Sequence, residues 1–252
     1  MSDRMIEQFM EMVQIDSESG NEAAMIEYLH KEFTEMGADS VIDEYGNLVA
    51  KFPEKGCSGK DPILLSCHAD TVMPGQGIKP VLKDGVIRSE GDTILGADDK
   101  AGIAAILEAL TRIHENPEWK HGLVKLAFTP DEDIGPGAKH FDVEKYGATG
   151  AYHMDRGQRG EVENETVCAD SAIVTFVGRD IHPGYAKDKM VPSVKVAGEF
   201  IAGLAREGAP ETTEGMEGYI HPISIKGNTS ETEVHLLIRD FAQEGLRPKA
   251  EM

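Results

Sequence analysis

The chain has 252 residues, of which 40% are hydrophobic, enough for one ordinary core and a smaller second domain. Its 45 acidic residues against 25 basic ones give a formal charge of -20, which disfavours nucleic acid and anionic membrane surfaces as partners. Three scattered cysteines without a CxxC spacing argue against a disulfide framework and a thiolate zinc site, and no signal peptide or membrane span is evident. We therefore expect a cytoplasmic protein.

Strands alternate with helices along the first 165 residues. Helices are predicted where apolar residues recur at helical spacing, over 3–13, 21–36 and 101–113. Strands are predicted where short apolar runs lie between turns, over 40–44, 48–52, 62–67, 122–128 and 151–154. This order predicts an α/β domain with a largely parallel sheet.

The pattern changes after about residue 165. A strand over 172–177 is followed by an amphipathic helix over 194–204 and two strands over 219–225 and 232–238. The order β-α-β-β predicts a small antiparallel sheet with helices on one side. A further helix and strand would complete this motif, and only 241–252 remain for them.

The segment Leu64–Val72 ends a predicted buried strand with His68 and Asp70, two residues apart. In open α/β sheets, ligands bind beyond the carboxyl ends of strands, so His68 could give one ring nitrogen to a metal while Asp70 bonds the other. The ordinary alternative is a loop histidine beside a solvated aspartate, which is the commoner case for so short a motif.

Acidic residues also stand at the ends of three other elements, at 98–99, 131–133 and 153–156. Adjacent carboxylates repel each other unless a cation or a helix N-terminus offsets the repulsion. Each segment alone also fits a structural role, namely a helix N-cap, an acidic loop, or a turn in which Asp155 pairs with Arg156. Together they place hard oxygen ligands and one imidazole at one edge of the sheet, which suits zinc, manganese or cobalt in a one- or two-metal hydrolytic site.

Six longer motifs carry a family resemblance: HADTV, GADDKAG, TPDEDIGPGA, IHPGYAKDKMV, PETTEGMEGYIH and LIRDF. Their order and context resemble the peptidase T family, within the superfamily of two-zinc aminoacylases, dipeptidases and carboxypeptidases. The resemblance runs to about residue 241. It implies a metal-dependent aminopeptidase that hydrolyses short peptides such as tripeptides with a water activated by two zinc ions.

The same resemblance implies a domain organisation. Residues 1–165 would form the N-terminal part of the catalytic α/β domain, and residues 166–252 an inserted α+β lid and dimerisation domain that is incomplete here. Relatives pair through that domain, so a homodimer is expected.

Four metal ligands are implied by the family pattern, with Mn²⁺ or Co²⁺ as alternatives to zinc. His68 and Asp155 would bind the first metal, Asp98 would bridge the two metals, and Asp133 would bind the second. Relatives usually have a glutamate at the position of Asp133, so the second metal is expected to sit differently or bind more weakly. The Asp98-Asp99 peptide bond is often cis in relatives.

Four further residues match catalytic or substrate-binding positions of the family. Asp70 would orient the metal-binding histidine, and Glu132 would be the general base. His182 would stabilise the oxyanion, across the dimer in some relatives, and Arg239 would bind the terminal carboxylate of the substrate.

Two other features depart from the family pattern. Pro192 stands where an asparagine is common, and the last metal ligand of relatives, a histidine near the C-terminus, has no counterpart, since the last histidine here is His235. A gene fragment, a truncated form or a diverged short form would each explain this, with sheet edges left exposed. The alternative functions are a related dipeptidase, an N-acyl-amino-acid deacylase, or an inactive metal-binding or dimerising remnant.

Overall fold

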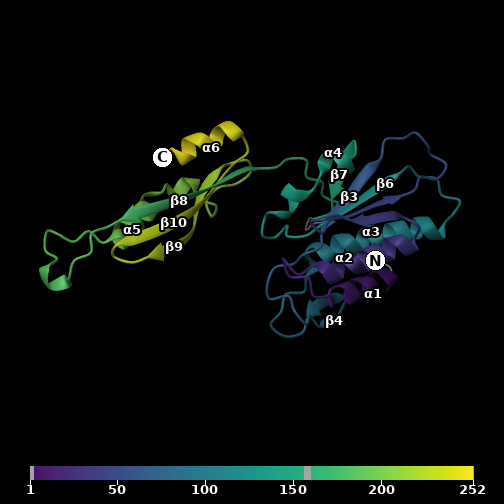
Figure 1. Ribbon diagram of the computed structural model, residues 1–252, viewed down its shortest axis with the longest axis horizontal. Helices are drawn as coiled ribbons and strands as arrows, with labels where there is room; N and C mark the ends of the chain where they lie inside the picture. The colour runs from purple at the N-terminus through teal and green to yellow at the C-terminus, as the bar shows by residue number, and fades with distance from the viewer. Residues whose placement is uncertain (1–2, 156–159, 252) are drawn as a thin grey trace. The chain divides into compact units, whose positions relative to one another are not determined.

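The computed structural model describes residues 3–155 and 160–251, and the chain divides into two compact units between residues 159 and 160 (Figure 1). Arg156, considered above as a partner of Asp155, lies outside the described residues. Among the described residues, no helix combines the length and the apolar character needed to cross a membrane.

The first unit is built on a five-stranded sheet. Its strands are β1 (Asp39–Ile42), β2 (Leu48–Phe52), β3 (Ile63–His68), β6 (Val124–Thr129) and β7 (Gly150–His153), in the spatial order β1-β2-β6-β3-β7. Strand β3 runs parallel to both of its neighbours, β6 and β7. In contrast, β2 is antiparallel to both β1 and β6.

The α/β class with a mostly parallel sheet is therefore confirmed, since only β2 runs opposite to the other four strands, including its chain neighbour β1. The short connection from β1 to β2 explains the reversed direction of β2, because only antiparallel neighbours can be joined by a tight turn. The Asp43 carboxylate caps that turn by accepting hydrogen bonds from the backbone N–H groups of Tyr45, Gly46 and Asn47 at 2.9–3.0 Å.

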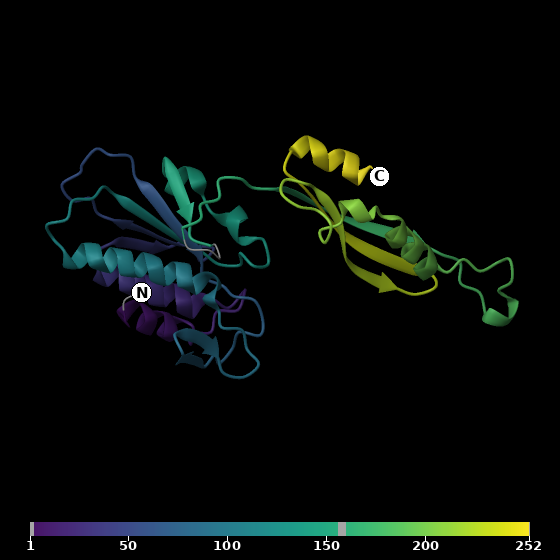
Figure 2. The ribbon, with the colours of Figure 1, turned by 180° about the vertical axis from the view of Figure 1, so that it is seen from behind.

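Three helices cover one face of this sheet, as Figures 1 and 2 show from opposite sides: α1 (Asp3–Met12), α2 (Ala23–Glu35) and α3 (Ala97–Glu115). The apolar core lies between the two layers, where the rings of Phe33 and Phe128 stack with centroids 5.2 Å apart. The turns η1 (Gly137–His140) and α4 (Val143–Tyr146) follow β6. Lys125 of β6 fixes this segment by donating hydrogen bonds to the backbone carbonyls of Tyr146 and Gly147.

A two-stranded hairpin, β4 (Pro80–Lys83) and β5 (Val86–Ser89), was missed by the sequence analysis. Its turn residues Asp84 and Gly85 both have positive φ, 53° and 76°. An Asp-Gly pair between short apolar runs is a strong hairpin signal, and it could have revealed this element.

The second unit has the expected β-α-β-β order. Strands β8 (Cys168–Val177), β9 (Tyr219–Gly227) and β10 (Glu231–Asp240) form an antiparallel sheet in the order β8-β10-β9. Helix α5 (Ser193–Gly203) and a further helix, α6 (Gln243–Ala250), bury Ala197 and Leu246 against the same face of β10. Two short 3-10 turns, η2 (Pro183–Tyr185) and η3 (Arg206–Gly208), lie in the connections.

Candidate metal centre

Acidic side chains and one imidazole converge where the parallel strands of the first unit end. His68 is the last residue of β3, and the segments after β6 and β7 begin at Pro130 and Met154. Because β3 pairs in parallel with both strands, their carboxyl ends lie side by side. The tertiary structure thus brings together three segments that lie 24 to 86 residues apart in the sequence.

Two groups of possible metal ligands result, and His68 belongs to both. One group is His68, Asp98 and Asp155, and the other is His68, Asp70 and Asp133. Within each group, one ligand atom per residue lies within 4.8 Å of the others. In the first group, Nε2 of the buried His68 is 3.0 Å from Oδ1 of the exposed Asp98. Asp98 and Asp99 are joined by a cis peptide bond at the start of α3.

The carboxylate of Asp70 is fully buried and already occupied by donors. Its oxygens accept hydrogen bonds from the Ser19 hydroxyl at 2.7 Å and from the backbone N–H groups of Glu132 at 3.0 Å and Asp133 at 3.1 Å. Nδ1 of His68 lies 3.3 Å from Oδ1 of Asp70. Because it already accepts three hydrogen bonds, Asp70 is better suited to orient the imidazole of His68 than to bind a cation itself.

The electrostatics of the group favour an added positive charge. Burial opposes protonation of His68, but the hydrogen bonds to Asp70 and Asp98 outweigh it and raise the pKa of His68 to about 10. Burial also raises the pKa of Asp99 to about 7 and, with the charge of Asp98, raises the pKa of Asp155. Without a cation, this cluster keeps protons that isolated groups would release.

The residues present fit a divalent cation. The first group offers a buried imidazole nitrogen and two carboxylates that repel each other, and such nitrogen and oxygen donors suit zinc and related divalent metals. Asp133, in the second group, lies on the exposed turn after β6, and burial together with nearby carboxylates raises its pKa. A cation beside these carboxylates would offset their repulsion.

The other predicted residues are placed as follows. Glu132 is exposed on the same turn as Asp133, with its backbone fixed by Asp70. His182 and Arg239 belong to the second unit, where His182 precedes η2 and accepts a hydrogen bond from the Gly184 N–H at 3.1 Å. Nε of Arg239 is buried without a hydrogen-bond partner.

Sequence reasoning missed two residues that contact this site, Ser19 and Glu22. Ser19 donates to Asp70, and Glu22 accepts from the backbone N–H of Asp131 at 3.3 Å. They lie in the connection between α1 and α2, which carries no periodic pattern or motif that could have revealed them.

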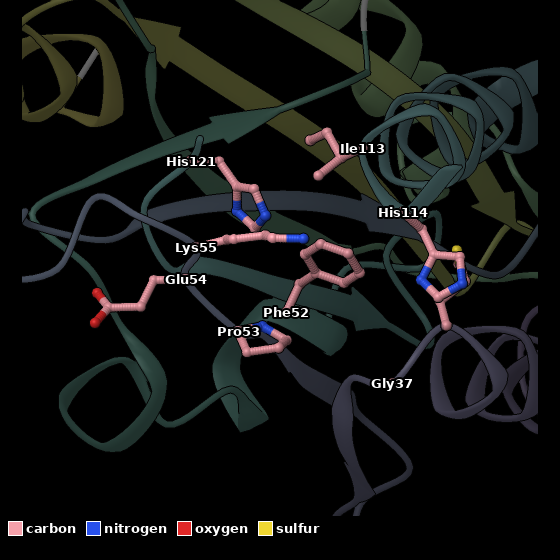
Figure 3. A pocket seen from close by; sticks show the side chains of 9 residues that line it. Gly37, Phe52, Pro53, Glu54, Lys55, Ile113, His114 and His121 are labelled. Atoms are coloured by element: carbon pink, nitrogen blue, oxygen red, sulfur yellow. The ribbon is translucent and has the colours of Figure 1, made fainter. Parts of the chain in front are cut away.

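A pocket of about 250 Å³ lies at the other end of the strands from the His68 cluster, near the end of β2 and the start of β6 (Figure 3). Its walls combine apolar groups such as Phe52 with His114, His121 and Lys55, and the Glu54 carboxylate points away from the Phe52 ring. Neither histidine belongs to a group of three possible metal ligands within the described residues. Among the described residues, both groups of possible metal ligands therefore contain His68.

Comparisons with known proteins show which family the chain is similar to. The family model described as peptidase family M20/M25/M40 matches residues 64–231. Peptidase T of a Geobacillus species is 37% identical, over 97% of this chain and 70% of the relative. Aminopeptidase PepT from Bacillus cereus is 32% identical with a TM-score of 0.83, and the match covers 99% of this chain and 69% of that one. A tripeptidase from Staphylococcus aureus is 28% identical with a TM-score of 0.84, over 98% and 69%.

The chain belongs to peptidase family M20/M25/M40. The predicted resemblance to the peptidase T family is thereby confirmed, and the chain spans about 70% of the length of the Geobacillus relative.

Proposed function

We propose that the protein is a metal-dependent aminopeptidase that removes the first residue of short peptides, and of tripeptides in particular. The observation that carries this proposal is the convergence of His68, Asp98 and Asp155, whose ligand atoms lie within 4.8 Å of one another. The names of the similar proteins, peptidase T, aminopeptidase and tripeptidase, supply the substrate class.

Two divalent cations, zinc in the first instance, would be held by four side chains. His68 and Asp155 would bind one, Asp133 would bind the other, and Asp98, at 3.0 Å from Nε2 of His68, would bridge them. When bound, such cations polarise the scissile carbonyl and make water acidic enough to attack at neutral pH.

The remaining roles belong to groups that touch protons or substrate. Glu132 would take a proton from the attacking water and deliver it to the leaving amine, from a turn that Asp70 holds in place. His182 would stabilise the oxyanion, and Arg239 would bind the terminal carboxylate as a planar donor. The orphaned Nε of Arg239 is compatible with a ligand at that place.

The first test is an activity assay with metal analysis on the purified chain. We expect a tripeptide with a free N-terminus to be cleaved faster than a dipeptide or an acetylated amino acid, with two equivalents of metal bound. Faster cleavage of the dipeptide or of the acetylated amino acid would replace the proposal with a dipeptidase or a deacylase. One equivalent or none, without turnover, would indicate an inactive remnant.

The second test is Glu132→Ala, which removes the base without removing a proposed ligand. We expect kcat to fall by about 10²- to 10⁴-fold while the metal content stays unchanged. Glu144→Ala, an exposed glutamate of α4 in the same unit, is the matched control and should keep full activity. Full activity of Glu132→Ala would refute the mechanism.

The domain roles and the assembly are also proposals. Residues 1–165 would provide the catalytic part and residues 166–252 the lid and dimerisation part. The sheet of the second unit has two edge strands, β8 and β9, and unpaired edges favour pairing with a second copy. Sedimentation analysis should give a homodimer, and a monomer at all concentrations would exclude it. The free cysteines Cys57, Cys67 and Cys168 favour a reducing compartment, which we take to be the cytoplasm.

A further inference from the structure

The turn that carries Glu132 and Asp133 is held by a row of backbone hydrogen bonds. Three successive N–H groups donate to carboxylate oxygens: Asp131 to Oε1 of Glu22 at 3.3 Å, Glu132 to Oδ1 of Asp70 at 3.0 Å, and Asp133 to Oδ2 of Asp70 at 3.1 Å. Asp131 has a positive φ of 56°, and such a left-handed residue lets successive N–H groups point to one side. Two buried carboxylates thus fix the position of the turn.

Both carboxylates are themselves fixed by the segment between α1 and α2, residues 17–22, which we call the strap. The Ser19 hydroxyl donates to Oδ2 of Asp70 at 2.7 Å, and the Gly20 N–H donates to Oε1 of Glu22 at 2.6 Å. These contacts join residues that are far apart in the sequence: Ser19 and Asp70 are separated by 51 residues, and Glu22 and Asp131 by 109.

The strap is anchored to the loop after β3 on its other side. Thr71 exchanges backbone hydrogen bonds with Ser17 at 2.9 Å and Ser19 at 3.1 Å. The buried Glu18 accepts from the Gly75 N–H and from the Gln76 side chain, both at 2.7 Å. The strap therefore contacts both the loop that contains Asp70 and the acidic turn.

We propose that Ser19 and Glu22 are positioning residues for the Asp131–Asp133 turn. Ser19 acts through Asp70, whose carboxylate it holds in the orientation that serves both His68 and the two backbone N–H groups. Glu22 acts directly on the N–H of Asp131. The consequence for metal binding and turnover rests on the proposed function, whereas the consequence for the turn itself does not.

The primary test is backbone amide exchange on the chelator-treated protein, which requires neither metal nor activity. In Ser19→Ala, we expect exchange at Glu132 and Asp133 to accelerate at least tenfold, because their acceptor loses its orientation. Ser19→Thr keeps the hydroxyl and should restore slow exchange. Glu22→Ala should accelerate exchange at Asp131, and Glu22→Gln, which keeps an acceptor oxygen, should restore it.

The matched control is Ser40→Ala, which removes another serine hydroxyl that contacts a side chain, at 2.9 Å from Nδ1 of His30. It should leave the exchange of all three turn amides unchanged. The proposal is overturned if the Ser19→Ala amides exchange at the wild-type rate, or if Ser40→Ala accelerates them equally.

The second test is metal affinity, measured by competition with a chromophoric chelator, together with kinetics. We expect Ser19→Ala to weaken the affinity of one metal site by about tenfold, because loss of a supporting hydrogen bond typically changes metal affinity or activity by 10- to 100-fold. For the same reason, kcat should fall at least tenfold, while KM stays within about twofold of the wild-type value. Faster amide exchange with unchanged affinity and kcat would overturn the functional part. Absence of metal from the wild-type protein would refute the proposed function instead, and the exchange pattern would then decide the positioning role alone.

Discussion

Gly102, near the start of α3, packs closely against Asp99, Met154 and Cys67, next to the candidate metal centre. A Cβ added there would lie 2.3 Å from Oδ1 of Asp99, 2.5 Å from the backbone carbonyl oxygen of Met154 and 3.0 Å from Sγ of Cys67. We predict that Gly102→Ala destabilises the first unit and weakens metal binding, although alanine is the better helix former.

The magnitude follows from two opposing effects. Alanine in a helix interior is favoured over glycine by about 1 kcal/mol. Against this, the Met154 oxygen is 0.9 Å short of the 3.4 Å at which an ordinary contact begins. Overpacking of this kind costs roughly 1–3 kcal/mol, so the net loss should be up to about 2 kcal/mol. Asp155 directly follows Met154. If the Met154 backbone moves by the missing 0.9 Å, the shift exceeds the roughly 0.2 Å tolerance of a metal–ligand distance.

The assay is urea unfolding with chelator present, followed by metal titration of the folded variant. Gly198→Ala in α5 is the matched control, because its Cβ would meet nothing within 4 Å. That variant should gain about 0.5–1 kcal/mol. The reasoning is refuted if Gly102→Ala is as stable as the wild type and binds metal equally well.

Two further predictions concern stability. Folding raises the pKa of Asp99 from 3.8 to about 7, so its protonation stabilises the fold fully below pH 3.8, and this stabilisation is lost as the pH rises through 7. Folding raises the pKa of His68 from 6.5 to about 10, and the stabilisation from its protonation declines in the same direction above pH 6.5. The free energy of unfolding of the metal-free protein should therefore fall between pH 4 and pH 7, and Asp99→Asn should flatten this decline; an unchanged slope in Asp99→Asn would contradict the assignment. Phe128→Ala should cost about 3–5 kcal/mol in urea unfolding, because it empties a fully buried site stacked on Phe33, and a loss below about 1 kcal/mol would show that the core closes over the gap.

Much of the fold could be predicted because helices and strands depend on neighbouring residues. The apolar spacing of the first two helices and the buried runs of β3 and β6 are local signals, and the structure confirms them to within a few residues. The β4–β5 hairpin and helix α6 were missed. The hairpin was missed because each of its strands has only four residues, and α6 because its sequence has no strong apolar periodicity.

The convergence of the acidic segments could also be expected, because strand ends are local features and parallel strands place them at one edge. The sequence therefore predicts that His68, Asp98 and Asp155 lie close together, and the structure brings their ligand atoms within 4.8 Å of one another. Their roles as ligands stay predictions until metal is measured.

The sequence by itself determined most of the secondary structure, the α/β class and the motifs that identify the family, since each of these resides in short stretches of chain. Only the tertiary structure decided the direction of β2 in the sheet, the burial of Asp70 and the hydrogen bonds of Ser19 and Glu22. The physical reason is that these features depend on contacts between strands, or between groups 51 to 109 residues apart in the sequence. A short window of sequence does not specify which distant group will donate a hydrogen bond to a buried carboxylate.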